Sequence, residues 1–298
     1  MALQLKGSMV ALVTPFREDK SVDWDALTRL VDRQLAGGTS ALIICGTTGE
    51  ASTMTPQECK EVLSFVVKQV DGKVPVIAGT GSNNTAVAVQ ASLNAKEAGV
   101  DGLLVVTPPY NKPTQEGLLD YYNTIIKAVQ LPVVLYNVPG RTCCNLLPET
   151  AAILAKDPLV VAIKDATADM NVASRIKELC GDQLTLLSGD DFTALPQLSV
   201  GSEGWISVTA NIVPEDMAAM YDAWVAGDIE KARAIHFKTL PLHRMLFFRS
   251  NPIPSKAALA LMGHCEDHVR SPLLALNDED RAVVTEALKG YGLLEGAA

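Results

Sequence analysis

The chain has 298 residues, of which 48% are hydrophobic and 20% are charged, so a large core can form and disorder is not expected. The formal net charge of −9 and the lack of a run of basic residues argue against a nucleic-acid or membrane-surface partner. The N-terminus has no apolar h-region followed by a cleavage site, and no apolar stretch reaches the roughly 18 residues of a membrane helix. We therefore expect a cytoplasmic protein.

Eight short apolar runs recur along the chain, each followed by a stretch with helical character. Their starts are about 20 to 35 residues apart, which is the size of a strand–helix unit. The runs are continuously apolar rather than alternating, which is typical of parallel strands buried on both faces. The predicted strands span residues 9–14, 41–45, 74–78, 102–106, 132–136, 160–164, 184–188 and 205–208.

Eight such units in succession predict an α/β fold, a (β/α)8 TIM barrel. Two intervening segments, 24–38 and 85–100, are amphipathic, and Gly99 is suited to end the second of these helices. The alternative is a six-stranded doubly wound sheet. That fold would need a G-x-G-x-x-G turn after the first strand, and the sequence there, Thr14-Pro15-Phe16, is unlike it.

The chain changes character after residue 225, because no further strand pattern follows. We predict three helices there, one through residues 231–248, one from Ser255 to Met262 and one near the C-terminus. The expected organisation is a barrel catalytic domain over residues 1–225 and a C-terminal helical extension over residues 226–298 that packs on the barrel.

The residue types that are absent from the predicted strand ends limit the reactions that the chain can catalyse. Reacting groups of a TIM barrel lie at the C-terminal ends of its strands, but all four histidines lie in the tail. A zinc-dependent aldolase would lack its imidazole ligands, and His264 and His268, one helical turn apart, are expected to be packed or solvated helix residues. Asp190 and Asp191 could hold magnesium, although their position favours an N-cap for the next helix. We expect no metal and no organic cofactor.

Lys164 is the one lysine at the eight predicted strand ends. On an alternating strand it shares a face with Ala162 and Val160, and if that face points inward the small Ala162 leaves room for the lysine stem. Apolar walls lower the pKa of a lysine, and a neutral amine attacks a ketone to form a Schiff base. A structural ion pair with the adjacent Asp165 is the alternative, which is disfavoured because consecutive strand residues point to opposite faces.

A Schiff-base lysine needs proton donors and a carboxylate site nearby. Tyr136 ends the preceding strand, Thr47 follows the second strand and Tyr110 lies just past the fourth, so hydroxyl groups can pass a proton. The turn GTTGE (46–50) can cradle a carboxylate with its N–H groups, and Arg141, five residues after Tyr136, can bind another. A rim tyrosine, an ordinary turn and a solvated arginine are the alternatives.

Eight segments, in order, resemble the dihydrodipicolinate synthase family of pyruvate-dependent class I aldolases, and the resemblance covers nearly the whole chain. They are GTTGE (46–50), IAGTGSNNT (77–85), TPPYNKPTQEGL (107–118), YNVPGRT (136–142), IKDAT (163–167), LSGDD (187–191), ISVTAN (206–211) and NPIPSKAAL (251–259).

The resemblance implies a set of catalytic residues. Lys164 would form an imine with pyruvate, and a proton relay would consist of Thr47, Tyr110 and Tyr136. The neighbouring subunit would supply Tyr110, since the family is commonly a homotetramer built from two tight dimers.

The same resemblance implies the substrate contacts. Thr48 would hold the carboxylate of pyruvate, and Arg141 would receive the carboxylate of L-aspartate 4-semialdehyde. Ile206 would line the pyruvate pocket through its backbone carbonyl, and Gly189 would be a further substrate-binding residue.

The implied reaction is the condensation of pyruvate with L-aspartate 4-semialdehyde to 4-hydroxy-tetrahydrodipicolinate, in lysine and diaminopimelate biosynthesis. One alternative is a pyruvate-releasing aldolase for a 2-keto-3-deoxy sugar acid or a sialic acid, although such relatives generally lack the YNVPxRT form found at 136–142. An alternative of another class is a non-catalytic barrel that binds a keto acid.

The sequence departs from the family pattern at two places. Gly140 stands where serine is frequent, and Cys143-Cys144 stand where a glycine or small residue usually follows the threonine.

Lysine-inhibited members carry two histidines, a glutamate and a tyrosine near the dimer interface. Here Asn83 matches but those positions hold Pro56, Cys59, Val87 and Pro109. Because a bound lysine's ammonium would lack acceptors, we predict weak or absent feedback by lysine.

Overall fold

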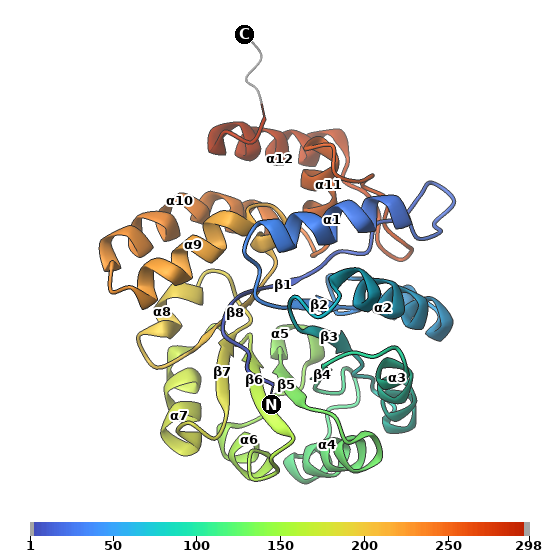
Figure 1. The fold of residues 1–298 in the computed structure, drawn as a ribbon, viewed down its shortest axis with the longest axis vertical. Helices are drawn as coiled ribbons and strands as arrows, with labels where there is room; N and C mark the ends of the chain where they lie inside the picture. The colour runs from blue at the N-terminus through green and yellow to red at the C-terminus, as the bar shows by residue number, and fades with distance from the viewer. Residues whose placement is uncertain (1–2, 295–298) are drawn as a thin grey trace.

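Eight parallel strands form a closed barrel in a computed structural model that describes residues 3–294 of the chain. The first strand pairs with both the second and the eighth, which closes the ring seen in Figure 1. Each strand overlaps one predicted run, so the (β/α)8 TIM barrel is confirmed and the doubly wound sheet is excluded. The strands are β1 (Gly7–Ala11), β2 (Leu42–Ile44), β3 (Val76–Gly79), β4 (Gly102–Val106), β5 (Val133–Asn137), β6 (Val160–Asp165), β7 (Thr185–Ser188) and β8 (Gly204–Ser207).

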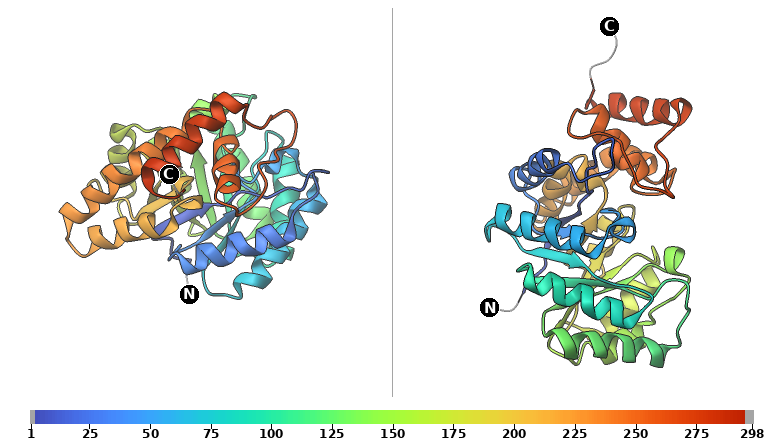
Figure 2. Two further views of the ribbon diagram at one scale, coloured as in Figure 1. Left: turned by 90° about the horizontal axis from the view of Figure 1, so that it is seen from above. Right: turned by 90° about the vertical axis from the view of Figure 1, so that its right-hand side faces the viewer.

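Helices follow the strands and cover the outside of the barrel (Figures 1 and 2). Local capping explains where they begin and end. Thr55 and Glu58 form a capping box at the start of α2, and Gly99, with a φ of +88°, follows the end of α3 as the sequence predicts. The barrel helices are α1 (Trp24–Ala36), α2 (Pro56–Val70), α3 (Thr85–Glu97), α4 (Gln115–Val129), α5 (Pro139–Thr142), α6 (Pro148–Leu154), α7 (Met170–Cys180), α8 (Ala194–Leu198) and α9 (Pro214–Val225), with 3-10 turns η1 (Ala51–Thr53) and η2 (Thr209–Asn211).

Two apolar layers fill the fold, one inside the barrel and one between the strands and the helices. Ala162 packs in the inner layer, as expected for a residue that leaves room beside Lys164. Val160 packs in the outer layer instead, because the pairing of β5 with β6 shifts register between Val133 and Val134. The prediction that Val160 shares the face of Lys164 is therefore wrong.

Between the barrel and residue 294, the chain forms three more helices, as predicted. They are α10 (Ile229–Phe247), α11 (Ile253–Leu261) and α12 (Asp278–Tyr291). Figure 1 and the right-hand view of Figure 2 place α11 and α12 beyond α1 at one end of the molecule. The expected boundary at residue 225 falls at the last residue of α9. The division into a barrel domain and an extension stays a prediction.

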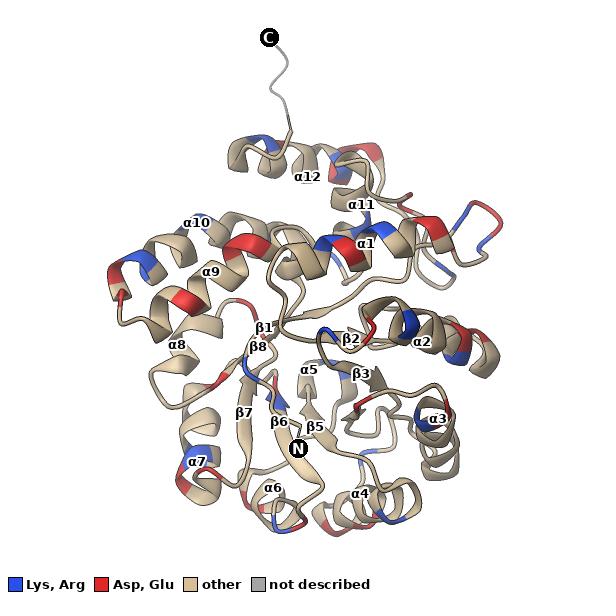
Figure 3. Cartoon of the chain, viewed as in Figure 1, with Lys and Arg blue, Asp and Glu red and all other residues tan. Residues whose placement is uncertain are grey.

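Charged residues of both signs lie close together on the outer helices, whereas the strands are largely uncharged (Figure 3). Within residues 3–294, no helix combines the length and the apolar character needed to cross a bilayer.

Candidate active site

A cavity of about 120 Å³ opens at the C-terminal ends of the strands, where the sites of TIM barrels lie. Residues of the barrel line it together with two residues from beyond α9, Phe247 at the end of α10 and Asn251. Six of the eight predicted site residues line this one cavity: Thr47, Thr48, Tyr136, Arg141, Lys164 and Gly189.

Lys164 sits near the end of β6 with its side chain in the cavity, and only 5% of the residue is exposed. No carboxylate of residues 3–294 forms an ion pair with it. The adjacent Asp165 accepts hydrogen bonds from Thr167 and Gln197 on the other face of the strand. The amine is therefore buried without the structural partner that would hold it as an ammonium.

Burial lowers the pKa of Lys164 to about 8. The carboxylate of Asp191 raises that pKa, and the guanidinium of Arg141 lowers it further. A pKa of about 8 leaves roughly a tenth of the amine neutral at pH 7, against less than about a thousandth at an ordinary lysine pKa of about 10.4. The site can therefore present a nucleophilic amine at neutral pH.

Tyr136 lies directly opposite Lys164 in the pairing of β5 with β6. The Lys164 ammonium is 4.5 Å from the centroid of the tyrosine ring. Burial raises the pKa of the Tyr136 phenol, while the Arg141 guanidinium and the Thr47 hydroxyl lower it. A phenol that keeps its proton in this position is suited to act as a general acid beside the amine.

Thr48 and Arg141 are joined through a residue that sequence reasoning missed. The side-chain amide of Asn251 donates a hydrogen bond of 2.8 Å to the Thr48 hydroxyl. The Arg141 guanidinium donates to the Asn251 carbonyl at 3.3 Å. The motif NPIPSKAAL was recognisable in the sequence, but nothing in it indicated that its first residue reaches the barrel mouth.

Gly189 touches the stem of Lys164. A Cβ atom at this glycine would lie 2.9 Å from Cγ and Cε of Lys164 and 2.9 Å from Cβ of Ala166. The lack of a side chain therefore leaves the space that the lysine occupies. Ile206 lies on β8 in the inner layer and is 1% exposed, outside the lining of the cavity.

Tyr110 does not reach the cavity of its own chain. The residue follows β4, has a φ of 73° and is 88% exposed. Its N–H donates to the Thr142 carbonyl at 3.2 Å, which fixes the loop while the side chain faces outward. A left-handed tyrosine is strained, and the exposed ring is placed where another molecule can contact it.

The aspartates after β7 hold loops rather than capping α8. Asp190 accepts the N–H of Thr193, and Asp191 accepts the N–H groups of Val208 and Thr209. Because α8 begins at Ala194 after Thr193, the predicted N-cap is wrong. No group of three potential ligands gathers among residues 3–294 in a way that could hold a metal ion. The expectation that no cofactor is needed stays a prediction.

The histidine pair of the tail is not on a helix. His264 and His268 lie in the loop between α11 and α12, so the prediction that they are one helical turn apart is wrong. Gly263 has a φ of +76° and ends the preceding helix.

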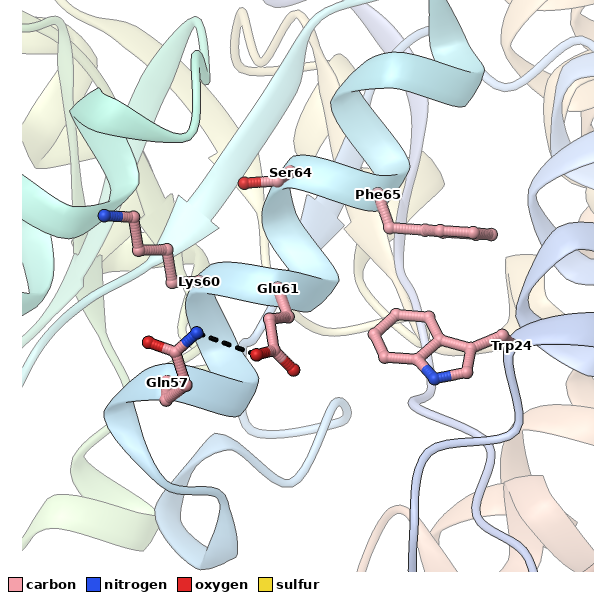
Figure 4. Close-up of a pocket in the computed structure, with 6 residues that line it drawn as sticks. All are labelled: Trp24, Gln57, Lys60, Glu61, Ser64 and Phe65. Carbon is pink, nitrogen blue, oxygen red and sulfur yellow. Dashed lines mark hydrogen bonds between the residues drawn. The ribbon is translucent and has the colours of Figure 1, made fainter.

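A second hollow, of about 450 Å³, lies outside the barrel between Trp24 and the exposed face of α2 (Figure 4). The Trp24 and Phe65 rings are 5.1 Å apart at their centroids, and Gln57 donates to Glu61 at 2.7 Å. None of the predicted site residues lines it. The chemistry therefore belongs to the cavity at the strand ends.

The fold and the cavity together define a (β/α)8-barrel enzyme of the aldolase type, with a buried lysine at the strand ends. The sequence model of the dihydrodipicolinate synthetase family matches residues 4–291. The chain belongs to the dihydrodipicolinate synthetase family.

Individual relatives agree over nearly their whole length. The chain is 52% identical over 289 residues to 4-hydroxy-tetrahydrodipicolinate synthase of Geobacter sulfurreducens, which covers 97% of this chain and 99% of the relative. The structure of dihydrodipicolinate synthase from Aquifex aeolicus is 42% identical, with a TM-score of 0.94 over 97% of this chain and 99% of that one. The chloride-inhibited enzyme from Acinetobacter baumannii, complexed with pyruvate, is also 42% identical, with a TM-score of 0.95 over 98% and 100%.

Proposed function

We propose that this chain condenses pyruvate with L-aspartate 4-semialdehyde to give 4-hydroxy-tetrahydrodipicolinate, in lysine and diaminopimelate biosynthesis. The observation that carries this proposal is the unpaired amine of Lys164, buried in the cavity and 4.5 Å from the centroid of the Tyr136 ring. Family membership and relatives named for this activity support it. A neutral amine beside a proton donor is what imine formation requires.

The first step is attack of the Lys164 amine on the keto carbon of pyruvate. The new C–N bond gives a carbinolamine, whose oxygen takes a proton and leaves as water to form the imine. Tyr136, whose ring faces the amine, is proposed as the general acid for that oxygen, and Thr47 lines the same cavity. Loss of a proton from the pyruvate methyl then gives an enamine, whose carbon attacks the aldehyde, and the resulting alkoxide takes a proton. The amino group of the semialdehyde then attacks the imine carbon and displaces the Lys164 amine, which closes the ring of the product and frees the enzyme.

The carboxylates of the two substrates bind at separate places in this proposal. Thr48 holds the pyruvate carboxylate, with its hydroxyl already fixed by Asn251. Arg141 binds the carboxylate of the second substrate, because a guanidinium at the rim of the cavity can bind a carboxylate with two hydrogen bonds. Ile206 is proposed to line the pyruvate pocket through its backbone carbonyl, and Gly189 is proposed as a further substrate-binding residue.

We also propose that the enzyme is a homotetramer in which Tyr110 enters the cavity of a neighbouring subunit. The exposed ring and the strained backbone of Tyr110 support this role. A cytoplasmic location is part of the proposal, since all six cysteines are free thiols, as is usual in a reducing compartment.

The test measures pyruvate consumed by the purified enzyme with different aldehydes. We expect turnover with L-aspartate 4-semialdehyde and little with sugar aldehydes. Arg141→Leu should raise the KM for the semialdehyde more than the KM for pyruvate. Faster release of pyruvate from a 2-keto-3-deoxy sugar acid would favour the aldolase alternative, and binding without turnover of any aldehyde would favour the keto-acid sensor.

A further inference from the structure

Glu50 and Lys256 form an ion pair that is almost completely removed from solvent. Lys256 Nζ lies 2.5 Å from Glu50 Oε1, and the two side chains are 0% and 1% exposed. The same ammonium donates to the His268 carbonyl at 2.8 Å and lies 3.9 Å from the centroid of the Phe16 ring. Neither residue lines the cavity at the strand ends, so the mechanism proposed above gives the pair no role.

A buried ion pair by itself adds little to the net stability of a fold. The desolvation of two charges offsets most of their attraction, and apolar residues of similar size often do as well. Burial lowers the pKa of Lys256 although the Glu50 carboxylate raises it, so the site disfavours the charged form. A pair kept under such conditions is better explained by the geometry it imposes.

The pair acts on the turn that carries Thr47 and Thr48. Glu50 is the last residue of that turn and has a left-handed backbone, with φ 55° and ψ 31°. Its N–H donates to the Thr47 carbonyl at 3.1 Å, and the preceding Gly49 carbonyl accepts from the Thr14 hydroxyl at 2.8 Å. The anchored carboxylate therefore holds one end of the turn in a conformation that glutamate rarely adopts by itself.

The partners of the Thr48 and Glu50 side chains come from one part of the chain, the extension. Lys256 binds one oxygen of Glu50, and the Arg270 N–H donates to the other at 3.0 Å. Five residues before Lys256, Asn251 donates to the Thr48 hydroxyl at 2.8 Å. The extension thus holds the turn at two points, Thr48 and Glu50.

We propose that the Glu50–Lys256 ion pair positions the Thr47–Thr48 turn for the pyruvate carboxylate, so that the C-terminal extension is a positioning part of the active site. This inference rests on the proposed function, because it is that function which gives Thr48 a carboxylate to bind. Glu50 and Lys256 do not touch substrate and act through the turn.

The test replaces both charges at once, as Glu50→Leu with Lys256→Met. The double variant leaves no unpaired buried charge, which could unfold either single variant. The matched control is Lys60→Met with Glu97→Leu, because that ion pair of 2.6 Å joins two helices at the surface. Steady-state kinetics, thermal unfolding and hydrogen exchange of the peptide covering residues 46–54 are measured for both double variants and the wild type.

We expect the Glu50/Lys256 variant to fold, with the KM for pyruvate raised about tenfold and the KM for the semialdehyde changed less than about twofold. Its 46–54 peptide should exchange faster, while the control behaves as wild type. Pyruvate KM and exchange that match the wild type would overturn the proposal. A double variant that cannot fold would overturn it as well, because the pair would then serve the fold.

The two proposals fail in different ways. If wild type and control do not consume pyruvate, the proposed function is wrong. The exchange of residues 46–54 still decides whether the ion pair holds the turn, since that measurement needs no substrate.

Discussion

Lys164 and Tyr136 are direct partners across the pairing of β5 with β6, and the lysine ammonium lies 4.5 Å from the centroid of the tyrosine ring. Both side chains point into the inner part of the barrel, where Ala162 and Gly189 leave space for the lysine stem. Because the two strands fix this relationship, the amine and the phenol stay together without depending on a loop.

Imine formation should depend on pH through the neutral fraction of Lys164. Its pKa of about 8 lies below the ordinary value, so the rate of adduct formation at low pyruvate should rise about tenfold between pH 6 and pH 7 and level off above about pH 8. The measurement is the rate of inactivation by pyruvate and borohydride from pH 6 to 10. A rate that keeps rising to pH 10 would show an unperturbed amine.

The Arg141→Leu variant tests whether the charge of Arg141 contributes to the low pKa of Lys164. Its guanidinium lowers the pKa of Lys164, so Arg141→Leu should move the midpoint of the pH profile to higher pH. A midpoint that moves to lower pH, or does not move, contradicts the electrostatic account.

The Tyr136→Phe variant keeps the aromatic ring and removes the phenol hydroxyl, which is the proposed general acid. We expect kcat to fall about 100- to 1,000-fold, the usual scale for loss of a general acid, with little change in the KM for pyruvate. The control is Tyr122→Phe, since the Tyr122 hydroxyl donates to the Val105 carbonyl at 3.1 Å outside the cavity. That change should cost about 1 kcal/mol of stability and leave kcat near wild type. Equal kinetic effects in the two variants would remove Tyr136 from the mechanism.

Gly189→Ala tests the space around the lysine. A Cβ atom there would lie 2.9 Å from Cγ and Cε of Lys164, so the amine must move. A displacement of this kind should slow adduct formation by about 100-fold. Gly140→Ala, on α5, is the matched control, because no described atom other than those of its chain neighbours and its own helix lies within 4 Å of the added Cβ. If Gly189→Ala forms the adduct as fast as Gly140→Ala, Lys164 does not need its present position.

Lysine should inhibit the enzyme weakly or not at all. The side chains of Pro56, Val87 and Pro109 offer no acceptor for an ammonium, and Val87 is 52% exposed on α3. We expect less than about twofold inhibition at about 1 mM lysine, because binding of the lysine ammonium depends on such acceptors. Strong inhibition of the purified enzyme at submillimolar lysine would contradict this.

The barrel could be predicted from sequence because its strands are buried on both faces. Runs such as 102–106 are continuously apolar and keep the spacing of strand–helix units. Strand order in such a barrel follows the order along the chain, so the sequence alone predicts that Lys164 and Tyr136 lie on adjacent strands. The caps at Thr55 and Gly99 are local signals of the same kind.

The remaining features depend on contacts far apart in the sequence. The register shift that turns Val160 outward arises from the pairing of β5 with β6, which periodicity within one strand does not reveal. Asn251 reaches Thr48 over 203 residues. The Glu50–Lys256 pair also joins distant segments, so single motifs gave no sign that the extension helps to form the site.

The mass of the enzyme after treatment with pyruvate and borohydride, followed by identification of the modified peptide, shows whether Lys164 forms the imine. Reduction of the imine should add about 72 Da, the mass of pyruvate less one water plus two hydrogens. We expect this mass on the peptide containing Lys164, and none on the Lys164→Ala protein when its unfolding midpoint is unchanged. An adduct on another lysine, or on the Lys164→Ala protein, would contradict it.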